Sequence, residues 1–132
     1  MARSIYVNLP VSDLDRAVQF FTAVGFIFNP EFTSEDATCM IVDDRIYVML
    51  LTRERFAGFT PKPVCDAGKA TEVLVCLQLD RREDVDAMVQ RAVGAGGRTY
   101  SEPQDHGFMY GHGFEDPDGH IWELVHMSAD GV

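Results

Sequence analysis

Three features of the sequence predict an α+β fold made of two βαβββ repeats. Each half begins with alternating apolar residues typical of a strand, at residues 5–11 and 73–79. A segment with the apolar spacing of a helix follows each strand, and three further β-type runs follow each helix. Aligning the two helices superposes Val7 on Val75 and keeps the strand register. We therefore expect the chain to be an internal duplication.

The first repeat is predicted to carry one helix and three further strands. The helix is expected to begin after Ser12, a typical N-cap residue with Asp15 three positions later, and to end at Gly25. The β-type runs lie at residues 26–33, 38–42 and 46–52, with a turn at residues 43–45 between the last two. Residues 53–56 are expected to form a mobile connector.

The second repeat is predicted in the same order. Asp80 and Glu83 are expected to cap its helix, which ends at the Gly96-Gly97 pair. Three β-type runs follow, at residues 98–101, 108–115 and 120–127. The Asp118-Gly119 dipeptide predicts a hairpin between the last two, because glycine adopts the positive φ that such a turn needs.

The repeats are expected to pack into a single domain that spans residues 1–132. Repeat one covers about residues 4–59, and repeat two about residues 71–128. Residues 60–70, which carry Pro61, Pro63 and Gly68, have little hydrophobic pattern and are interpreted as a linker. Half of a chain of 132 residues would bury little core by itself, so the halves should fold together.

The charge, apolar content and cysteines of the chain argue against several classes of partner and site. A net charge of −10 disfavours nucleic acid and anionic membrane surfaces as partners, because both attract Lys and Arg. No run approaches the roughly 18 apolar residues of a membrane span, and the N-terminus lacks the apolar core of a signal peptide. Cys39, Cys65 and Cys76 are odd in number and have no C-x-x-C spacing, which argues against disulfides and zinc. We expect a cytoplasmic protein.

Glu123 is the first candidate functional residue. In a strand over residues 120–127, it shares one face with Ile121 and Val125, because side chains alternate. A buried carboxylate among apolar residues is costly unless a cation, metal or hydrogen-bond donor meets it. Glu123 therefore either has a function or lies at the solvent edge of a half-exposed sheet, and this strand alone leaves both interpretations open.

Two motifs together resemble the vicinal oxygen chelate superfamily. One is Val-Ser-Asp-Leu-Asp-Arg-Ala at residues 11–17, with Phe20-Phe21 and Gly25-Phe26 after it; the other is Phe-Glu-Asp-Pro-Asp-Gly at residues 114–119, followed by Glu123-Leu124. That superfamily includes glyoxalase I, bleomycin-resistance proteins, fosfomycin-resistance enzymes and extradiol dioxygenases. The resemblance covers nearly the whole chain. It implies that eight strands form an open, barrel-like cup, with the helices outside and a ligand or metal inside.

The resemblance also implies where a metal would bind, and here the chain departs from the metal-dependent members. Their ligand positions correspond to Tyr6 and Leu74 on the first strands, and to Met49 and Glu123 on the last strands. Only Glu123 is a usual ligand, because divalent ions prefer imidazole nitrogen and carboxylate oxygen. A divalent metal cofactor is therefore disfavoured, and the sequence names no other cofactor.

The hairpin register suggests a partner for Glu123. If residues 116–119 form a four-residue loop, Glu115 lies opposite His120 and His112 lies opposite Glu123. Cross-strand Cβ atoms are about 4.5–5.5 Å apart, so the imidazole would reach the carboxylate. A His–Glu pair that only fills a core is the alternative. We predict Glu123 and His112 as catalytic residues. The ligand-binding residues expected in the same cup, beside Cys76, are Tyr6, Asn8, Met49, Leu74, Gln78 and Tyr110.

Three classes of function stay open at this point. One is an enzyme with Glu123 as general base on a small carbonyl or epoxide-like substrate. The second is a binding module for a flat or amphipathic small molecule, similar to bleomycin-resistance proteins. The third is a metal-dependent lyase or dioxygenase with His112 and Glu123 as unusual ligands. We rank small-molecule binding without the usual metal set first. A homodimer is expected, because proteins of the family commonly pair and open sheet edges associate.

Overall fold

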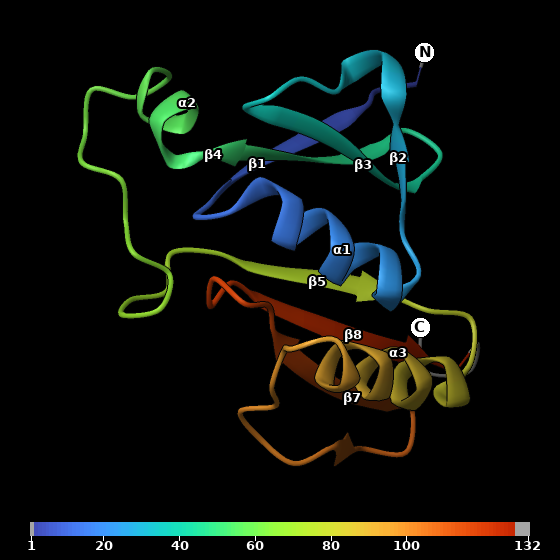
Figure 1. Ribbon diagram of the computed structural model, residues 1–132. Coiled ribbons are helices and arrows are strands. Elements are labelled where there is room, and N and C mark those ends of the chain that lie inside the picture. Colours follow the sequence, from blue (N-terminus) through green and yellow to red (C-terminus); the bar gives the residue numbers. More distant parts are fainter. Residues whose placement is uncertain (1, 129–132) are drawn as a thin grey trace. The chain divides into compact units, whose positions relative to one another are not determined.

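The computed structural model describes residues 2–128 and divides into two compact units, Met1–Cys65 and Asp66–Val132 (Figure 1). Each unit holds a four-stranded mixed sheet. The strand order is β1-β4-β3-β2 in the first unit and β5-β8-β7-β6 in the second. The two orders are the same, and in each unit the first strand pairs in parallel with the last. The α+β class and the duplicated strand order are confirmed.

The ladders also confirm the register of the repeat. In the first unit, β1 (Ile5–Val11) pairs with β4 (Ile46–Thr52), and Asn8 lies opposite Met49. In the second unit, β5 (Leu74–Gln78) pairs with β8 (Ile121–Met127), and Cys76 lies opposite Glu123. Met49 and Glu123 are therefore equivalent positions, as the sequence predicts.

The remaining elements of the first unit differ in part from the prediction. The run over residues 26–33 is a short strand, β2 (Ile27–Asn29), because Pro30 has no backbone N–H and begins a 3₁₀ turn, η1 (Pro30–Phe32). The next strand is β3 (Ala37–Asp43), between β2 and β4. The segment expected to be a mobile connector is a helical turn, α2 (Arg53–Ala57), capped by the Thr52 hydroxyl.

Helix α1 (Leu14–Val24) is capped by Asp13 and not by Ser12. The Asp13 carboxylate accepts a hydrogen bond from the Arg16 backbone N–H at 3.0 Å, whereas the Ser12 hydroxyl accepts one from the Arg16 guanidinium. Gly25, with φ of 123°, ends the helix as predicted. The buried face of α1 packs against its own sheet, and it consists of Ala17, Phe20, Phe21 and Val24.

Helix α3 (Arg82–Gly94) covers one face of the second sheet (Figure 1). The predicted caps, Asp80 and Glu83, are wrong: Arg81 occupies the N-cap position, and its side chain makes no capping bond. The core between α3 and the sheet is formed by aromatic and aliphatic residues of both, with Trp122 and Phe114 stacked at 6.3 Å between ring centroids. Its fully buried members are Val85, Ala92, Phe114, Trp122 and Leu124.

The outer edge of the second sheet is irregular. The predicted strand at residues 98–101 is a single backbone bridge between Arg98 and Glu115 of β7 (Met109–Glu115). Regular pairing resumes at β6 (Gln104–Asp105), where Gln104 lies opposite Gly111. The edge segment thus has two more residues than β7 between these points, and Pro103, which has no N–H to donate, lies in this bulge.

Within residues 2–128, no helix is long and apolar enough to cross a membrane.

Candidate functional site

Glu123 lies on the face of its sheet that is turned away from α3. Its ladder partners are Cys76 on β5 and Gly113 on β7, while its chain neighbours Trp122 and Leu124 point into the core beneath α3. The carboxylate is half-buried, and no hydrogen-bond or ion-pair partner for it occurs within residues 2–128. A half-buried carboxylate without a partner is available to a bound molecule.

The predicted pairing of His112 with Glu123 is wrong by one residue. Asp116 and His120 close the hairpin, since the Asp116 N–H donates to the His120 carbonyl at 3.0 Å. Three residues therefore form the loop instead of four, with Gly119 at φ of 93°. As a result, Glu115 lies opposite Ile121 and His112 lies opposite Leu124.

This shift places the three aromatic-ring residues of β7 on the helix side of the sheet. Tyr110, His112 and Phe114 share the face of Trp122 and Leu124. The Nε2 atom of His112 lies 2.9 Å from the backbone carbonyl of Ser101, and the Tyr110 hydroxyl donates to the carboxylate of Asp86 on α3. Neither side chain lies on the face of Glu123.

Tyr100 occupies the place that His112 was expected to take. Its hydroxyl lies over Gly113, 2.3 Å from the point where the Cβ atom of any larger residue would be. Gly113 is the ladder partner of Glu123, so the phenol lies on the carboxylate's face. The segment that carries Tyr100 is held to β7 by the Arg98–Glu115 bridge and by the contact of His112 with Ser101.

The electrostatics support a shared site for Tyr100, Cys76 and Glu123. Burial raises the pKa of the Tyr100 phenol, and the charge of Glu123 raises it further. Burial and Glu123 also raise the pKa of the Cys76 thiol. Both groups therefore keep their protons at neutral pH, so that the carboxylate can accept hydrogen bonds from a ligand while the phenol and thiol can donate them.

The other predicted ligand-binding residues lie on equivalent faces of the two units. Leu74 and Gln78 share the exposed face of β5 with Cys76. Tyr6, Asn8 and Met49 share one face of the first sheet. There the Tyr6 ring stacks on Tyr47, with ring centroids 4.7 Å apart. The structure thus groups Leu74 and Gln78 with Glu123, and Tyr6, Asn8 and Met49 with one another.

The loop at residues 102–107 is tied to α3. The Arg82 guanidinium binds the Asp105 carboxylate at 2.6 Å and lies 4.4 Å from the centre of the Tyr110 ring. Asp105 also accepts a hydrogen bond from the Gly107 N–H at 2.9 Å. Because Asp105 pairs with Tyr110 in the ladder, this anchor lies on the face opposite Glu123.

The anchor gives a prediction about pH. Arg82 and the Gly107 N–H hold the pKa of Asp105 at about 2, below its ordinary value of 3.8. A lowered carboxylate pKa stabilises the folded state above the unfolded pKa, and this stabilisation is lost as pH falls through the folded pKa. We expect Arg82→Gln to raise the pKa of Asp105, measured by NMR of its carboxyl carbon. The matched change Arg81→Gln should leave it unchanged; equal effects of the two would show that Arg82 is not the cause.

A metal fits this chain poorly. At the four positions where the resemblance places metal ligands, Tyr6, Leu74 and Met49 replace usual ligands, and Glu123 alone remains. His112 and Glu123 point to opposite faces of their sheet, so they cannot bind one ion together. Among residues 2–128, no group of three or more His, Cys, Asp or Glu side chains is arranged to hold a metal ion.

Comparisons with known proteins agree with this fold. Among solved structures, the chain is similar to a hypothetical protein from S. aureus, with 28% identity, a TM-score of 0.80, and coverage of 95% of this chain and 94% of that one. A glyoxalase/bleomycin resistance protein/dioxygenase family enzyme from Burkholderia phytofirmans PsJN is 19% identical, with a TM-score of 0.78 and coverage of 96% of this chain and 100% of that one. A genomically encoded fosfomycin resistance protein from Listeria monocytogenes is 16% identical, with a TM-score of 0.70 and coverage of 99% of this chain and 98% of that one. The last two likenesses concern the fold alone.

No curated protein matches the chain significantly. One family model, by contrast, matches residues 3–124, which include both repeats and Glu123. The duplicated strand order and the hairpin before Glu123 are the structural counterparts of that match. The chain therefore belongs to the Glyoxalase/Bleomycin resistance protein/Dioxygenase superfamily.

Proposed function

We propose that this protein binds a small molecule through Glu123, without the metal-ligand set of the metal-dependent members of its superfamily. The observation that carries the proposal is the half-buried Glu123 carboxylate, which has no partner within residues 2–128 and lies beside Tyr100 and Cys76. Leu74 and Gln78 on β5 extend the same surface. Apolar surface with a few polar groups is typical of small-molecule sites.

The negative charge at Glu123 favours a ligand that is basic and carries a hydrogen-bond donor. Glu123 accepts hydrogen bonds, so the ligand needs an N–H or O–H group at that point. A net charge of −10 attracts basic molecules and repels anions. Among the compounds named by the family and by a neighbour, bleomycin is basic and fosfomycin is an anionic phosphonate. Bleomycin is therefore the better probe.

If the bound molecule also reacts, Glu123 is the group placed to act as a general base, and Tyr100 is placed to donate a proton. His112 would then be a positioning residue, since it holds the Ser101 carbonyl next to Tyr100. We do not propose a lyase or dioxygenase with His112 and Glu123 as joint metal ligands, because the two side chains lie on opposite faces of the sheet.

The test is the affinity for bleomycin, measured by calorimetry with Glu123→Gln and a matched surface change, Glu72→Gln. Glu72 is an exposed carboxylate just before β5. Loss of one hydrogen bond to a charged group corresponds to about tenfold or more in Kd. We expect that weakening for Glu123→Gln, unchanged binding for Glu72→Gln, and no binding of fosfomycin by either variant. Equal binding by both variants would refute the proposal.

We also propose that the protein is a homodimer. Strand β2 lies at the edge of the first sheet, and Ile27 on it is 65% exposed. An exposed apolar edge strand favours association with another chain. Light scattering at tens of micromolar should give a dimer, and Ile27→Lys should give a monomer. A monomeric native protein would contradict the proposal.

Finally, we propose that the protein works in the cytoplasm. Cys39 and Cys76 are free thiols, and Cys76 is exposed. Such thiols persist in a reducing compartment. Cell fractionation followed by immunodetection would test this, and recovery from an oxidising compartment would contradict it.

A further inference from the structure

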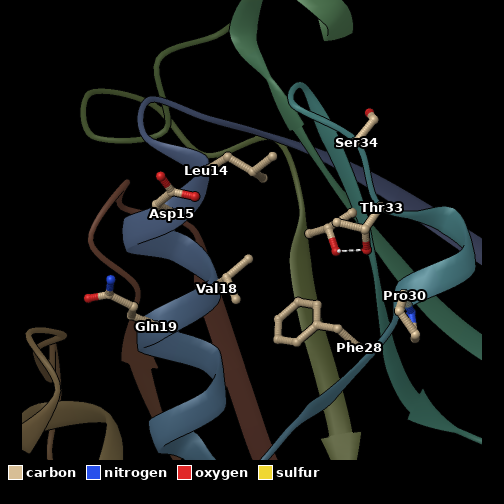
Figure 2. A pocket seen from close by; sticks show the side chains of 9 residues that line it. Leu14, Asp15, Val18, Gln19, Phe28, Pro30, Thr33 and Ser34 are labelled. Carbon is tan, nitrogen blue, oxygen red and sulfur yellow. Dashed lines mark hydrogen bonds between the residues drawn. The ribbon is translucent and has the colours of Figure 1, made fainter.

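A pocket lies in the first unit, apart from Glu123. It is a pocket of about 540 Å³ between α1 and the segment formed by β2, η1 and the start of β3 (Figure 2). Its apolar walls are Leu14 and Val18 from α1, and Phe28 and Pro30 from the facing segment. The volume lies within the usual range for small-molecule sites, roughly 300–1,000 Å³.

The hydroxyl protons of the three Ser and Thr residues in this pocket are engaged in hydrogen bonds within the chain. The Thr33 hydroxyl donates to the Asn29 carbonyl at 3.0 Å. The Thr33 and Thr38 oxygens are also 3.0 Å apart, as the dashed line in Figure 2 indicates, so Thr38 must be the donor in that bond. The Ser34 hydroxyl donates to the Asp36 carboxylate at 2.9 Å. Each of the three oxygens therefore retains only acceptor capacity.

The helix side of the pocket adds a negative charge. Asp15 on α1 lines the pocket, and its carboxylate has no hydrogen-bond or ion-pair partner in the described part of the chain. Gln19, one turn further along α1, contributes an amide that can donate or accept. The polar lining thus consists of one carboxylate, three hydroxyl oxygens that can only accept, and one amide.

We propose that this pocket binds a primary alkylammonium ion. An ammonium group has three N–H donors and no acceptor, which matches a lining that is deficient in donors. Its charge is attracted by Asp15 and by the net charge of −10. The alkyl chain is accommodated by Leu14, Val18, Phe28 and Pro30. A carboxylate of the same length would find a donor only in the Gln19 amide and would be repelled by Asp15.

The first test is an NMR titration of the ¹⁵N-labelled protein with hexylammonium chloride, with sodium hexanoate as the matched anion. We expect saturable shifts of backbone amides at residues 14–19 and 33–38 with hexylammonium, and none there with hexanoate. Shifts with both compounds, or hexylammonium shifts elsewhere only, would overturn the proposal.

Variants then locate the charge. Asp15→Asn keeps the shape of an exposed side chain, and it should weaken hexylammonium binding about tenfold, since a charge-assisted hydrogen bond is lost. Asp80→Asn removes one charge at an exposed site in the second unit and should have no effect. Gln19→Glu should tighten binding. An unchanged Kd in Asp15→Asn, or equal effects of Asp15→Asn and Asp80→Asn, would refute the proposal.

This site is independent of the proposed function at Glu123. Glu123→Gln should bind hexylammonium as the native protein does, whatever its affinity for bleomycin. If hexylammonium binding were lost in Glu123→Gln but retained in Asp15→Asn, the amine would occupy the Glu123 site, and the pocket proposal would be wrong.

Discussion

Replacing Trp122 with alanine is expected to lower the free energy of unfolding by about 3–5 kcal/mol, the usual cost of truncating a large buried aromatic residue. Trp122 is fully buried, stacks on Phe114, and donates its indole N–H to Asp116 at 3.2 Å. The variant therefore loses both packing and a hydrogen bond. Urea unfolding should be followed by circular dichroism, because Trp122 is the chain's single tryptophan.

The control for this change is Phe108→Ala in the same unit. Phe108 is 53% exposed, so its truncation should cost less than about 1 kcal/mol. Similar losses for the two variants would show that Trp122 does not anchor the core beneath α3.

Asp116→Ala is the second change with a large expected effect. The Asp116 carboxylate is buried and accepts hydrogen bonds from the backbone N–H groups of Asp118 and His120 and from the Trp122 indole. Alanine would remove the acceptor of these three hydrogen bonds. A hydrogen bond to a charged group contributes about 1.5–3 kcal/mol, but alanine also removes the cost of burying the carboxylate, which raises the pKa of Asp116. We therefore expect a net loss of about 3–5 kcal/mol, measured by the same unfolding experiment.

The equivalent turn of the first unit provides the control. Asp44, between β3 and β4, is exposed, and Asp44→Ala should change stability by less than about 0.5 kcal/mol. If Asp116→Ala were as mild as Asp44→Ala, the hairpin would hold its register without the buried carboxylate.

The duplicated fold could be predicted from sequence because its signal is repeated. Alternating apolar residues predict which face of each strand is buried. The same order of elements occurs twice, so the register predicted for one repeat can be compared with that of the other, as at Val7 and Val75. Ends of elements were less predictable. Ser12 and Asp13 are both suitable N-cap residues, and the sequence does not tell which of them precedes the first helical residue. In the structure Asp13 has the extended backbone of an N-cap and caps α1.

The candidate site was predicted only in part. Glu123 and its face follow from periodicity, but the His112 pairing depended on loop length, and one residue fewer in the loop reverses the face of every side chain on β7. Tyr100 was missed because it lies on an irregular edge. Gly113 was the signal that could have indicated it, since a glycine within a strand often marks a close approach by another group.

The central claim is that Glu123 binds a small molecule without a metal, and the most direct measurement is a bleomycin titration of the protein in excess EDTA. The carboxyl carbon of Glu123 is followed by NMR while calorimetry gives the Kd. We predict that the Glu123 resonance shifts with saturation and that EDTA leaves the Kd unchanged. Binding that EDTA abolishes, or binding that leaves the Glu123 resonance in place, would contradict the claim.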